Sequence, residues 1–187
     1  MNVILRAKEV TKTYETAQRP SLDKISFSVA AGEFIGIMGA SGSGKTTLLN
    51  VLSTIDTPTS GEIWIDGVNL RHLNHTGAAD FRKDHLGFIF QEYFLLDSLT
   101  IRENISVPLT LQKLPPKKIE SMVQHLAGRF GIASQLDKYP GELSGGQRQR
   151  ASAARAIVKQ PSILFADEPT GALDSSSATE LLHALLE

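Results

Sequence analysis

The chain is most constrained by residues 39–46, which match the pattern of glycine, any four residues and then Gly-Lys-Thr. Ahead of them, the apolar run at 34–38 lacks polar alternation and predicts a fully buried strand. Behind them, apolar residues recur at helical spacing as far as Ile55 and predict a helix. A strand, a glycine-rich turn and a helix are the setting in which this pattern holds phosphate. The stretch therefore predicts a nucleoside triphosphate site rather than a flexible glycine turn.

This phosphate site would be built from backbone and side chains together. The glycines let successive N–H groups point inward, and the start of the helix adds its positive end. We expect the Lys45 ammonium to reach the β- and γ-phosphates and the Thr46 hydroxyl to bind Mg²⁺. The predicted nucleotide-binding residues of this stretch are Gly39, Ser41, Gly42, Ser43, Gly44, Lys45, Thr46 and Thr47.

Composition argues against several other classes of protein. Nineteen basic and 20 acidic side chains give a formal net charge of −1, which argues against a dedicated nucleic-acid binder. The absence of cysteine excludes disulfides and thiolate metal sites, and it fits a reducing compartment. No apolar run approaches the roughly 20 residues that span a bilayer, and residues 1–12 lack a signal-peptide core. We expect a cytoplasmic protein whose membrane role comes through a partner.

Hydrophobic periodicity predicts strands that alternate with helices over the 187 residues, which suffice for one domain. Helices are expected after Thr46, across much of 100–160 and from Ser175, with starts at Pro115-Pro116 and Ser144. Strands are expected at 3–14, 25–29, 34–38, 62–66, 85–90 and 163–166, with a hairpin turn at Asp66-Gly67. This order predicts an α/β fold with a mostly parallel sheet that binds its ligand at the carboxyl ends of the strands.

Two acids, Asp167 and Glu168, close the apolar strand at 163–166. They would lie at the sheet edge that carries the phosphate loop. Asp167 there can hold Mg²⁺, and Glu168 can act as general base on the water that attacks the γ-phosphorus. Two acids after a strand are often only a solvated strand end, but their pairing with a phosphate loop favours the catalytic interpretation.

A second glycine-rich turn, Leu143-Ser144-Gly145-Gly146-Gln147, opens the helix near residue 144. A serine hydroxyl, free amides and a helix N-terminus can bind an anion, although alone the pattern would indicate a plain helix cap. Arg148 and Arg150 follow, and then the apolar strand that ends in two acids. In this combination the sequence resembles the ABC ATPases, and the resemblance covers the whole chain.

The resemblance implies a role for each matching position. Residues 39–47 would form the Walker A loop, Asp167 would be the Walker B aspartate that holds Mg²⁺, and Glu168 would be the catalytic base. Gln91 would touch Mg²⁺ and the attacking water. Tyr14 would stack on adenine, with an ordinary strand tyrosine as the alternative.

The resemblance also implies an assembly. The signature loop would cap the ATP bound to the other subunit, and residues 171–174 would form a D-loop that crosses the dimer interface. Because one chain carries one Walker A loop and one signature, we expect a homodimer with two ATP molecules at its interface. The signature residues are Ser144, Gly145, Gly146 and Gln147.

The implied fold is a P-loop NTPase with a mostly parallel sheet, an N-terminal antiparallel β part and a helical subdomain. We expect one ABC ATPase domain over residues 1–187. Its nucleotide-binding core would comprise 1–90 and 161–187, and its helical signature subdomain 91–160.

The loop after Gln91 lies where the family meets its permease, a separate membrane subunit, so we expect the protein at the inner face of the cell membrane. Residues 91–105 and Gly171 resemble the bacitracin-type exporters of peptide antibiotics. Extrusion of lipoproteins or macrolides is the alternative. Residues 93–96 have a further alternative, ordinary loop packing. No nucleic-acid partner is expected.

The sequence departs from the family's pattern after the D-loop. The switch histidine of the family follows that loop by a further helix and strand, whereas His183 stands nine residues past Asp174 inside a predicted helix. We therefore expect a C-terminally truncated chain without the switch region, and we do not assign His183 that role. An ATPase subunit and a nucleotide-binding module deficient in hydrolysis both stay possible.

Overall fold

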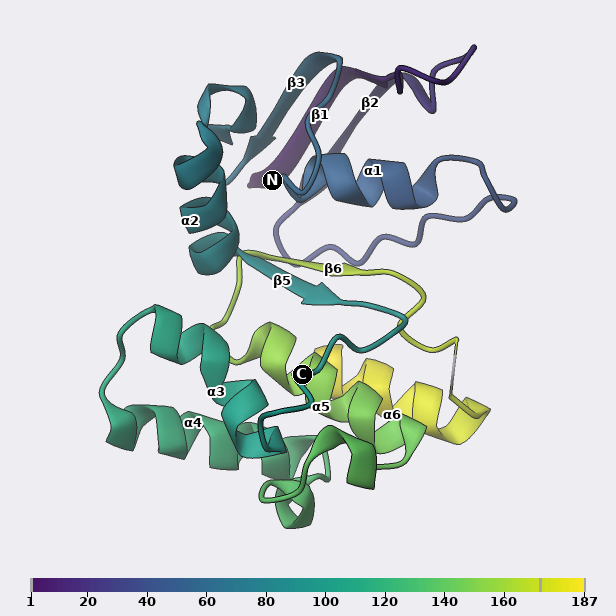
Figure 1. Cartoon of the computed structure of the whole chain (residues 1–187). Helices are drawn as coiled ribbons and strands as arrows, with labels where there is room; N and C mark the ends of the chain where they lie inside the picture. The colour runs from purple at the N-terminus through teal and green to yellow at the C-terminus, as the bar shows by residue number, and fades with distance from the viewer. Residues whose placement is uncertain (1, 172, 187) are drawn as a thin grey trace. The chain divides into compact units, whose positions relative to one another are not determined.

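The computed structural model describes residues 2–171 and 173–186 (Figure 1). The chain divides into two compact units, Met1–Arg82 and Lys83–Glu187. Helix α2 (His75–His85) runs across the boundary, and each unit contains a sheet of its own. Within the described ranges, no helix is long and apolar enough to cross a membrane.

An antiparallel sheet forms much of the first unit (Figure 1). Its strands lie in the order β2-β1-β3-β4, and every neighbouring pair is antiparallel. They are β1 (Val3–Lys12), β2 (Leu22–Ala30), β3 (Ser60–Ile65) and β4 (Val68–Asn69). Helix α1 (Lys45–Leu52) and the 3₁₀ turn η1 (Leu70–His72) complete the unit together with the start of α2. The sheet confirms the predicted N-terminal antiparallel β part.

A β-bulge keeps the buried side chains of β1 on one face. Leu5 and Ala7 are buried at a spacing of two, but the next buried residue, Val10, follows three positions later. The register with β2 shifts between Ala7 and Val10, and Glu9 has a φ of 48°. The extra residue returns Val10 to the core face. Gly61 of β3 faces this bulge, and a Cβ there would lie 2.4 Å from the Glu9 carbonyl oxygen.

The hairpin turn between β3 and β4 is formed by Asp66 and Gly67, as predicted. Their φ values of 51° and 78° are both left-handed, which a two-residue type I′ turn requires. The pairs Trp64–Asn69 and Ile65–Val68 close the ladder on either side.

The predicted buried strand at 34–38 is wrong. Residues 33–40 form no strand or helix, and Phe34 and Met38 are 69% and 95% exposed. Among the described residues, no strand pairs with this segment. An apolar run indicates only that a segment favours burial. A strand also requires a neighbour that satisfies its amides and carbonyls, and this segment has none within the described ranges.

The second unit combines a parallel strand pair with four further helices (Figure 1). Strands β5 (Leu86–Ile89) and β6 (Ile163–Ala166) pair in parallel without a register shift. The helices are α3 (Ile101–Leu111), α4 (Pro116–Arg129), α5 (Gly145–Ile157) and α6 (Ser175–Leu186), with 3₁₀ turns η2 (Ala133–Gln135) and η3 (Pro140–Glu142). The predicted parallel strands and the predicted helix starts are confirmed. Helix α2 escaped prediction because Phe81 is its one buried residue among those described.

The core of the second unit lies where α3 packs against α4 and α5. Helix α5 contributes mainly alanine, and such small side chains let the helix axes approach closely. The fully buried members include Ile101, Ile105 and Leu109 of α3, Val123 and Ala127 of α4, and Ala151, Ala153 and Ala154 of α5. This packing fixes the position of α5, whose N-terminus carries the second glycine-rich turn.

Gly87 of β5 offers a test of this packing. A Cβ there would lie 2.6 Å from the Ala156 carbonyl oxygen and 2.9 Å from the Leu164 side chain. We expect Gly87→Ala to lower the free energy of unfolding by about 1–3 kcal/mol, as overpacking does. Gly128→Ala is the control, since nothing lies within 4 Å of a Cβ at that position of α4. It should raise stability by up to about 1 kcal/mol. Urea titrations that gave both variants the same effect would contradict this packing.

Candidate functional site

The loop at 39–44 enters α1 through glycines in the left-handed region. Gly42 has a φ of 76° and Gly44 a φ of 91°. A Cβ on Gly44 would also lie 2.5 Å from the Ser21 carbonyl oxygen. Gly44 is the N-cap of α1, and no side chain caps the helix there. The local fold therefore demands glycine and leaves the start of α1 open.

A row of backbone amides at this helix start has no acceptor among the protein residues that the structure describes. In the part of the chain that the structure describes, the N–H groups of Gly42, Gly44, Lys45, Thr46 and Thr47 donate to no protein atom. The first turn of a helix also carries partial positive charge. Amides of this kind bind phosphate oxygens. The donor set therefore fits a nucleotide phosphate chain.

Lys45 adds a full positive charge to these amides. Its Nζ donates to the carbonyl oxygens of Gly39 and Ala40, at 2.8 and 2.9 Å. The side chain thus folds back over the loop and keeps the ammonium beside the open amides. Thr46 follows on the first turn of α1 and is exposed.

Tyr14 lies two residues past β1 and is held by an ion pair. Its hydroxyl donates to Asp56 Oδ2 at 3.1 Å. Lys12 Nζ donates to Asp56 Oδ1 at 2.6 Å and lies 4.9 Å from the centre of the Tyr14 ring. The ammonium therefore covers one face of the ring. Tyr14 is still 38% exposed, so the ring retains surface for a stacking partner.

The pKa of Asp56 is lowered by this cluster. Burial alone would raise the pKa, but hydrogen bonds from Lys12, the Thr57 amide and Tyr14, together with the Lys12 charge, bring it below its ordinary value. Sequence reasoning missed Lys12 and Asp56. The spacing of Lys12 and Tyr14 was a usable signal, since residues two apart share a face of an extended chain. Asp56 is 44 residues from Lys12 and had no local signal.

Gln91, Asp167 and Glu168 lie at one edge of the parallel pair. Ile89 and Ala166 are paired and end β5 and β6, and the Asp167 amide extends the ladder by donating to the Ile89 carbonyl at 2.9 Å. Gln91 follows two positions after Ile89 and is exposed. Both strands thus deliver their polar residues to the same carboxyl edge.

The backbone around Glu168 is constrained. Glu168 has a φ of 46°, and its carbonyl accepts from the Gly171 amide at 3.1 Å. Buried Gln149 of α5 donates its Nε2 to the Pro169 carbonyl at 2.7 Å, a contact that sequence reasoning also missed. Left-handed backbone at a residue other than glycine is often found at functional positions. The hydrogen bond from Gln149 ties the segment after β6 to α5.

Ser144 caps α5 in a capping box. Its Oγ accepts from the Gln147 amide at 3.3 Å, and its own amide donates to Gln147 Oε1 at 3.0 Å. The hydroxyl proton is not used in these bonds, so Ser144 can still donate to an anion. Gly145 and Gly146 follow in the first turn, where helix amides lack partners.

The predicted residues fall into the two units. Tyr14 and residues 39–47 belong to the first unit, whereas Gln91, the two acids and the signature turn belong to the second. Within residues 2–171 and 173–186, no three His, Asp or Glu side chains gather into a metal site. A Mg²⁺ held mainly by phosphate oxygens and one carboxylate needs no such cluster.

The predicted D-loop is described in part, because Ala172 lies outside the described residues. The Leu173 amide donates to the Thr170 carbonyl at 3.0 Å. Asp174 Oδ1 accepts from the amides of Ser176 and Ser177, both at 3.0 Å, and thereby caps α6. The contribution of the D-loop to a dimer interface stays a prediction.

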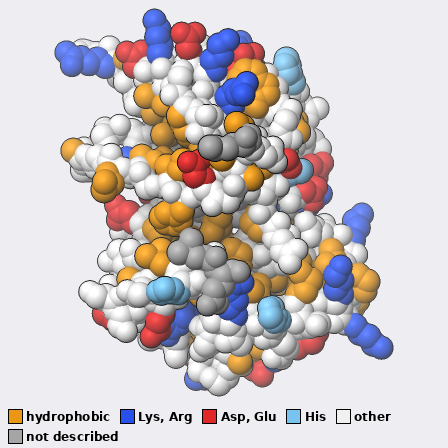
Figure 2. All heavy atoms as spheres, turned by 180° about the vertical axis from the view of Figure 1, so that it is seen from behind, with side chains coloured by type: hydrophobic (Ala, Val, Ile, Leu, Met, Phe, Trp, Pro, Cys, Tyr) orange, Lys and Arg blue, Asp and Glu red, His pale blue; other side chains and the backbone are white. Residues whose placement is uncertain are grey.

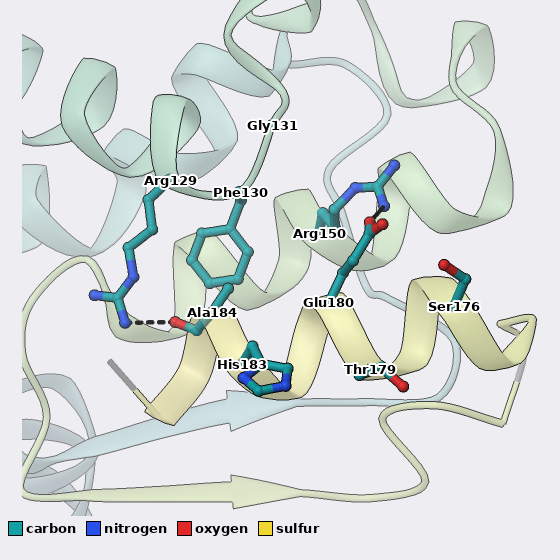
Figure 3. Close-up of a pocket in the computed structure, with 9 residues that line it drawn as sticks. All are labelled: Arg129, Phe130, Gly131, Arg150, Ser176, Thr179, Glu180, His183 and Ala184. Carbon is teal, nitrogen blue, oxygen red and sulfur yellow. Dashed lines mark hydrogen bonds and ion pairs between the residues drawn. The ribbon is translucent and has the colours of Figure 1, made fainter.

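A separate hollow of about 530 Å³ lies along α6 (Figure 3). Arg150 and Glu180 pair across it at 3.5 Å, and Arg129 donates to the Ala184 carbonyl. It is lined by Arg129, Phe130, Gly131, Arg150, Ser176, Thr179, Glu180, His183 and Ala184. None of these is a predicted site residue, so the hollow is distinct from the candidate nucleotide site.

A family model described as ABC transporter matches residues 22–171, which is most of the chain. The chain belongs to the ABC transporter family. This family membership confirms three predictions: an ABC-type ATP-binding subunit, ATPase activity and the P-loop NTPase fold class. Figure 2 shows both basic and acidic side chains on one face, in keeping with the nearly equal numbers of the two in the sequence.

The curated relatives include exporters of antibiotics. The bacitracin export ATP-binding protein BceA of Halalkalibacterium halodurans is 55% identical over 97% of this chain and 73% of its own length. The ABC transporter ATP-binding protein YxdL of Bacillus subtilis is 50% identical over 97% of this chain and 71% of its own length. A macrolide export ATP-binding/permease protein MacB of Yersinia pestis is 40% identical over 98% of this chain and 27% of its own length.

Solved structures give the same family. The dimeric post-hydrolysis state of the ATP-binding cassette MJ0796, bound to ADP and Pi, is 34% identical with a TM-score of 0.89. The match covers 97% of this chain and 81% of that chain.

The Asp56 cluster leads to a prediction of stability. Asp56→Asn removes the charge that Lys12 faces and should lower the free energy of unfolding by about 1 kcal/mol at neutral pH, a value discounted for solvent screening. Because the folded pKa is lowered, this contribution is present above the unfolded pKa and is lost as pH falls through the folded one. The difference in the free energy of unfolding between the wild type and the variant should therefore begin to narrow below about pH 4 and disappear below the lowered pKa of folded Asp56.

Urea titrations at several pH values measure this gap. Asp23→Asn, at an exposed position of β2, is the control. Its free energy of unfolding should stay within about 0.5 kcal/mol of the wild type at every pH. A gap for Asp56→Asn that is independent of pH would contradict the role of its charge.

Proposed function

We propose that this chain is the ATPase subunit of a transporter, which binds MgATP at residues 39–47 and energises a separate membrane permease. The observation that carries the proposal is the row of amides at the start of α1, which lack a protein acceptor within the described residues. The Lys45 ammonium beside them supports the same conclusion. Five amide donors and one cation match the charge and oxygen-rich surface of a triphosphate.

The base of the nucleotide would stack on Tyr14. Lys12 covers one face of the ring, so adenine would use the other face. Asp56 holds the hydroxyl end of the ring and thereby limits its rotation. Lys12 and Asp56 are thus positioning residues for Tyr14.

Hydrolysis would take place at the carboxyl edge of β5 and β6. Thr46, Gln91 and Asp167 would hold Mg²⁺, which supplies positive charge to the phosphate oxygens. Glu168 would accept a proton from water as the water oxygen bonds to the γ-phosphorus and the bond to the bridging oxygen breaks. Lys45 would neutralise charge on the γ-phosphate as this happens.

Two copies of the chain would form the working assembly. One chain has one phosphate loop and one signature turn, so Ser144, Gly145, Gly146 and Gln147 would act on the ATP of the partner copy. The similarity to a dimeric cassette supports this assembly. We also propose that both compact units belong to one ATPase domain over residues 1–187, with 91–160 as its helical subdomain.

The permease would dock on the loop that follows Gln91 and hold the protein at the inner face of the membrane. Phe94 and Leu96 are 57% and 48% exposed there. Exposed apolar side chains of this kind suit a docking surface. The substrate class would be peptide antibiotics that resemble bacitracin, a proposal supported by the 55% identity to a bacitracin export protein.

The nucleotide site is tested by two substitutions. Lys45→Ala should weaken ATP binding at least about tenfold, because a cation that faces the phosphates is lost. Glu168→Gln should keep binding but lower turnover by about 10²–10⁴. Calorimetry with ATP and a steady-state phosphate assay on the same preparations measure both, with Lys8→Ala as an exposed-lysine control.

The outcomes distinguish an ATPase subunit from a nucleotide-binding module that is deficient in hydrolysis. A folded wild type that binds no ATP would contradict the proposal altogether. Tight binding with an equally idle wild type and Glu168→Gln would show a nucleotide-binding module deficient in hydrolysis.

The docking loop is tested in cells that express the chain with the membrane subunit encoded beside it. Phe94→Ser should abolish both co-purification with that subunit and resistance to bacitracin, because an apolar contact is lost. Leu111→Ser is the matched control, since Leu111 is 59% exposed at the end of α3 and away from the loop. Resistance to a macrolide instead of bacitracin would contradict the proposed substrate class.

A further inference from the structure

The loop after Gln91 contains two consecutive aromatic residues with left-handed backbone. Tyr93 has a φ of 63° and Phe94 a φ of 45°. This region is disfavoured for bulky side chains and is kept only where surrounding contacts enforce it. The direction in which the exposed Phe94 side chain points therefore depends on the contacts that hold the backbone of Tyr93 and Phe94 in this region.

Helix α5 supplies those contacts. Ser152 Oγ and Arg155 Nη2 both donate to the Tyr93 carbonyl, at 3.0 and 2.8 Å. Arg155 Nη1 donates to the Phe94 carbonyl at 2.6 Å. The planar guanidinium thus meets two adjacent carbonyls with a fixed, coplanar pair of N–H donors, which a lysine side chain lacks.

The charge of Arg155 is committed to this loop. Burial lowers the pKa of the Arg155 guanidinium. Within the described residues its hydrogen-bond partners are the two loop carbonyls. A partly buried cation whose hydrogen-bond partners among the described residues are two carbonyls is costly to leave unpaired, so the loop and the helix hold each other.

The same loop also contacts the signature turn. The Arg148 guanidinium lies 5.5 Å from the centre of the Tyr93 ring and donates to the Leu143 carbonyl at 3.0 Å. The Tyr93 hydroxyl lies so close to Gly145 that a Cβ there would be 3.3 Å away. Tyr93 therefore joins the loop to the first turn of α5.

The far end of the loop is fixed to α3. Buried Asn104 accepts from the Leu96 amide at 2.7 Å and donates to the Leu96 and Leu99 carbonyls. Phe94 lies between this anchor and Arg155. The loop is therefore anchored by hydrogen bonds at residues 93–94 and again at Leu96 and Leu99, so a contact made by the exposed Phe94 side chain acts on a restrained segment.

We propose that Arg155 is a positioning residue that locks the loop after Gln91 to α5, so that permease docking is transmitted through Tyr93 and Arg148 to the signature turn. This inference rests on the proposed function for its docking partner and for the action of the signature. The contacts between Arg155 and the loop lie within this chain and do not depend on the docking partner.

The lock is tested first without any partner, by hydrogen exchange of the full chain. In Arg155→Lys, peptides that cover 91–99 should exchange at least about tenfold faster than in the wild type, because the shorter lysine side chain lacks the fixed, coplanar pair of donors that meets both carbonyls. Arg102→Lys is the matched control, since Arg102 of α3 pairs with Glu120 and Asp137 and, among the described residues, its side chain forms no hydrogen bond or ion pair with 91–99. It should leave exchange at 91–99 unchanged. Equal protection of this loop in the wild type and Arg155→Lys would overturn the proposal.

Coupling is tested by ATPase assays with and without the membrane subunit in vesicles. Arg155→Lys and Tyr93→Ala should keep the KM for ATP and the basal kcat within about twofold, yet lose at least about tenfold of the stimulation by the membrane subunit. The double variant should lose no more than either single variant, because both act in one path. Loss of basal and stimulated turnover together, or additive losses, would indicate a merely structural role and overturn the proposal. A wild type that is not stimulated contradicts the proposed permease partner, and the exchange experiment still decides the lock.

Discussion

Backbone amides that lack a protein acceptor within the described residues organise the candidate nucleotide site. Helices α3 and α5 each begin with a capping box, Thr100 with Glu103 and Ser144 with Gln147. Helix α1 begins instead at Gly44, and no side chain caps it. A capping box satisfies some of the amide donors at the starts of α3 and α5, whereas the start of α1 offers its donors to an acceptor from outside the chain. The choice of glycine over serine or threonine therefore marks the ligand site.

The two glycine-rich turns share chemistry but differ in how much they offer a ligand. At residues 42–47 the amides and Lys45 provide a binding set in one segment. At the signature turn the capping box already uses the lone pair of Ser144 and the amide of Gln147. The remaining donors are fewer, and the neighbouring Arg148 guanidinium is engaged with the Leu143 carbonyl and the Tyr93 ring. This difference supports the proposal that the signature turn acts on a nucleotide held elsewhere, rather than binding one alone.

Sequence patterns predicted those features that short segments decide for themselves. The Asp66-Gly67 turn and the start of α5 at Ser144 both depend on residues within a few positions of one another. The strand expected at 34–38 failed because strand formation depends on a neighbour, which an apolar run does not specify. Asp56 and Arg155 could not be found from sequence for a related reason. Each gains its role from a partner 42–62 residues away, and nothing in the local sequence records that contact.

Helix α5 connects the parts of the second unit that the proposed function uses. Arg148, Ser152 and Arg155 are spaced by four and three residues, so they lie on one face of the helix, and all three contact the loop at 93–94. Gln149, one position along from Arg148, holds the Pro169 carbonyl just after Glu168. The buried alanines of α5 pack in the core and leave the helix little room to bend. One rigid helix therefore joins the loop at 93–94 to the signature turn and to the backbone beyond Glu168.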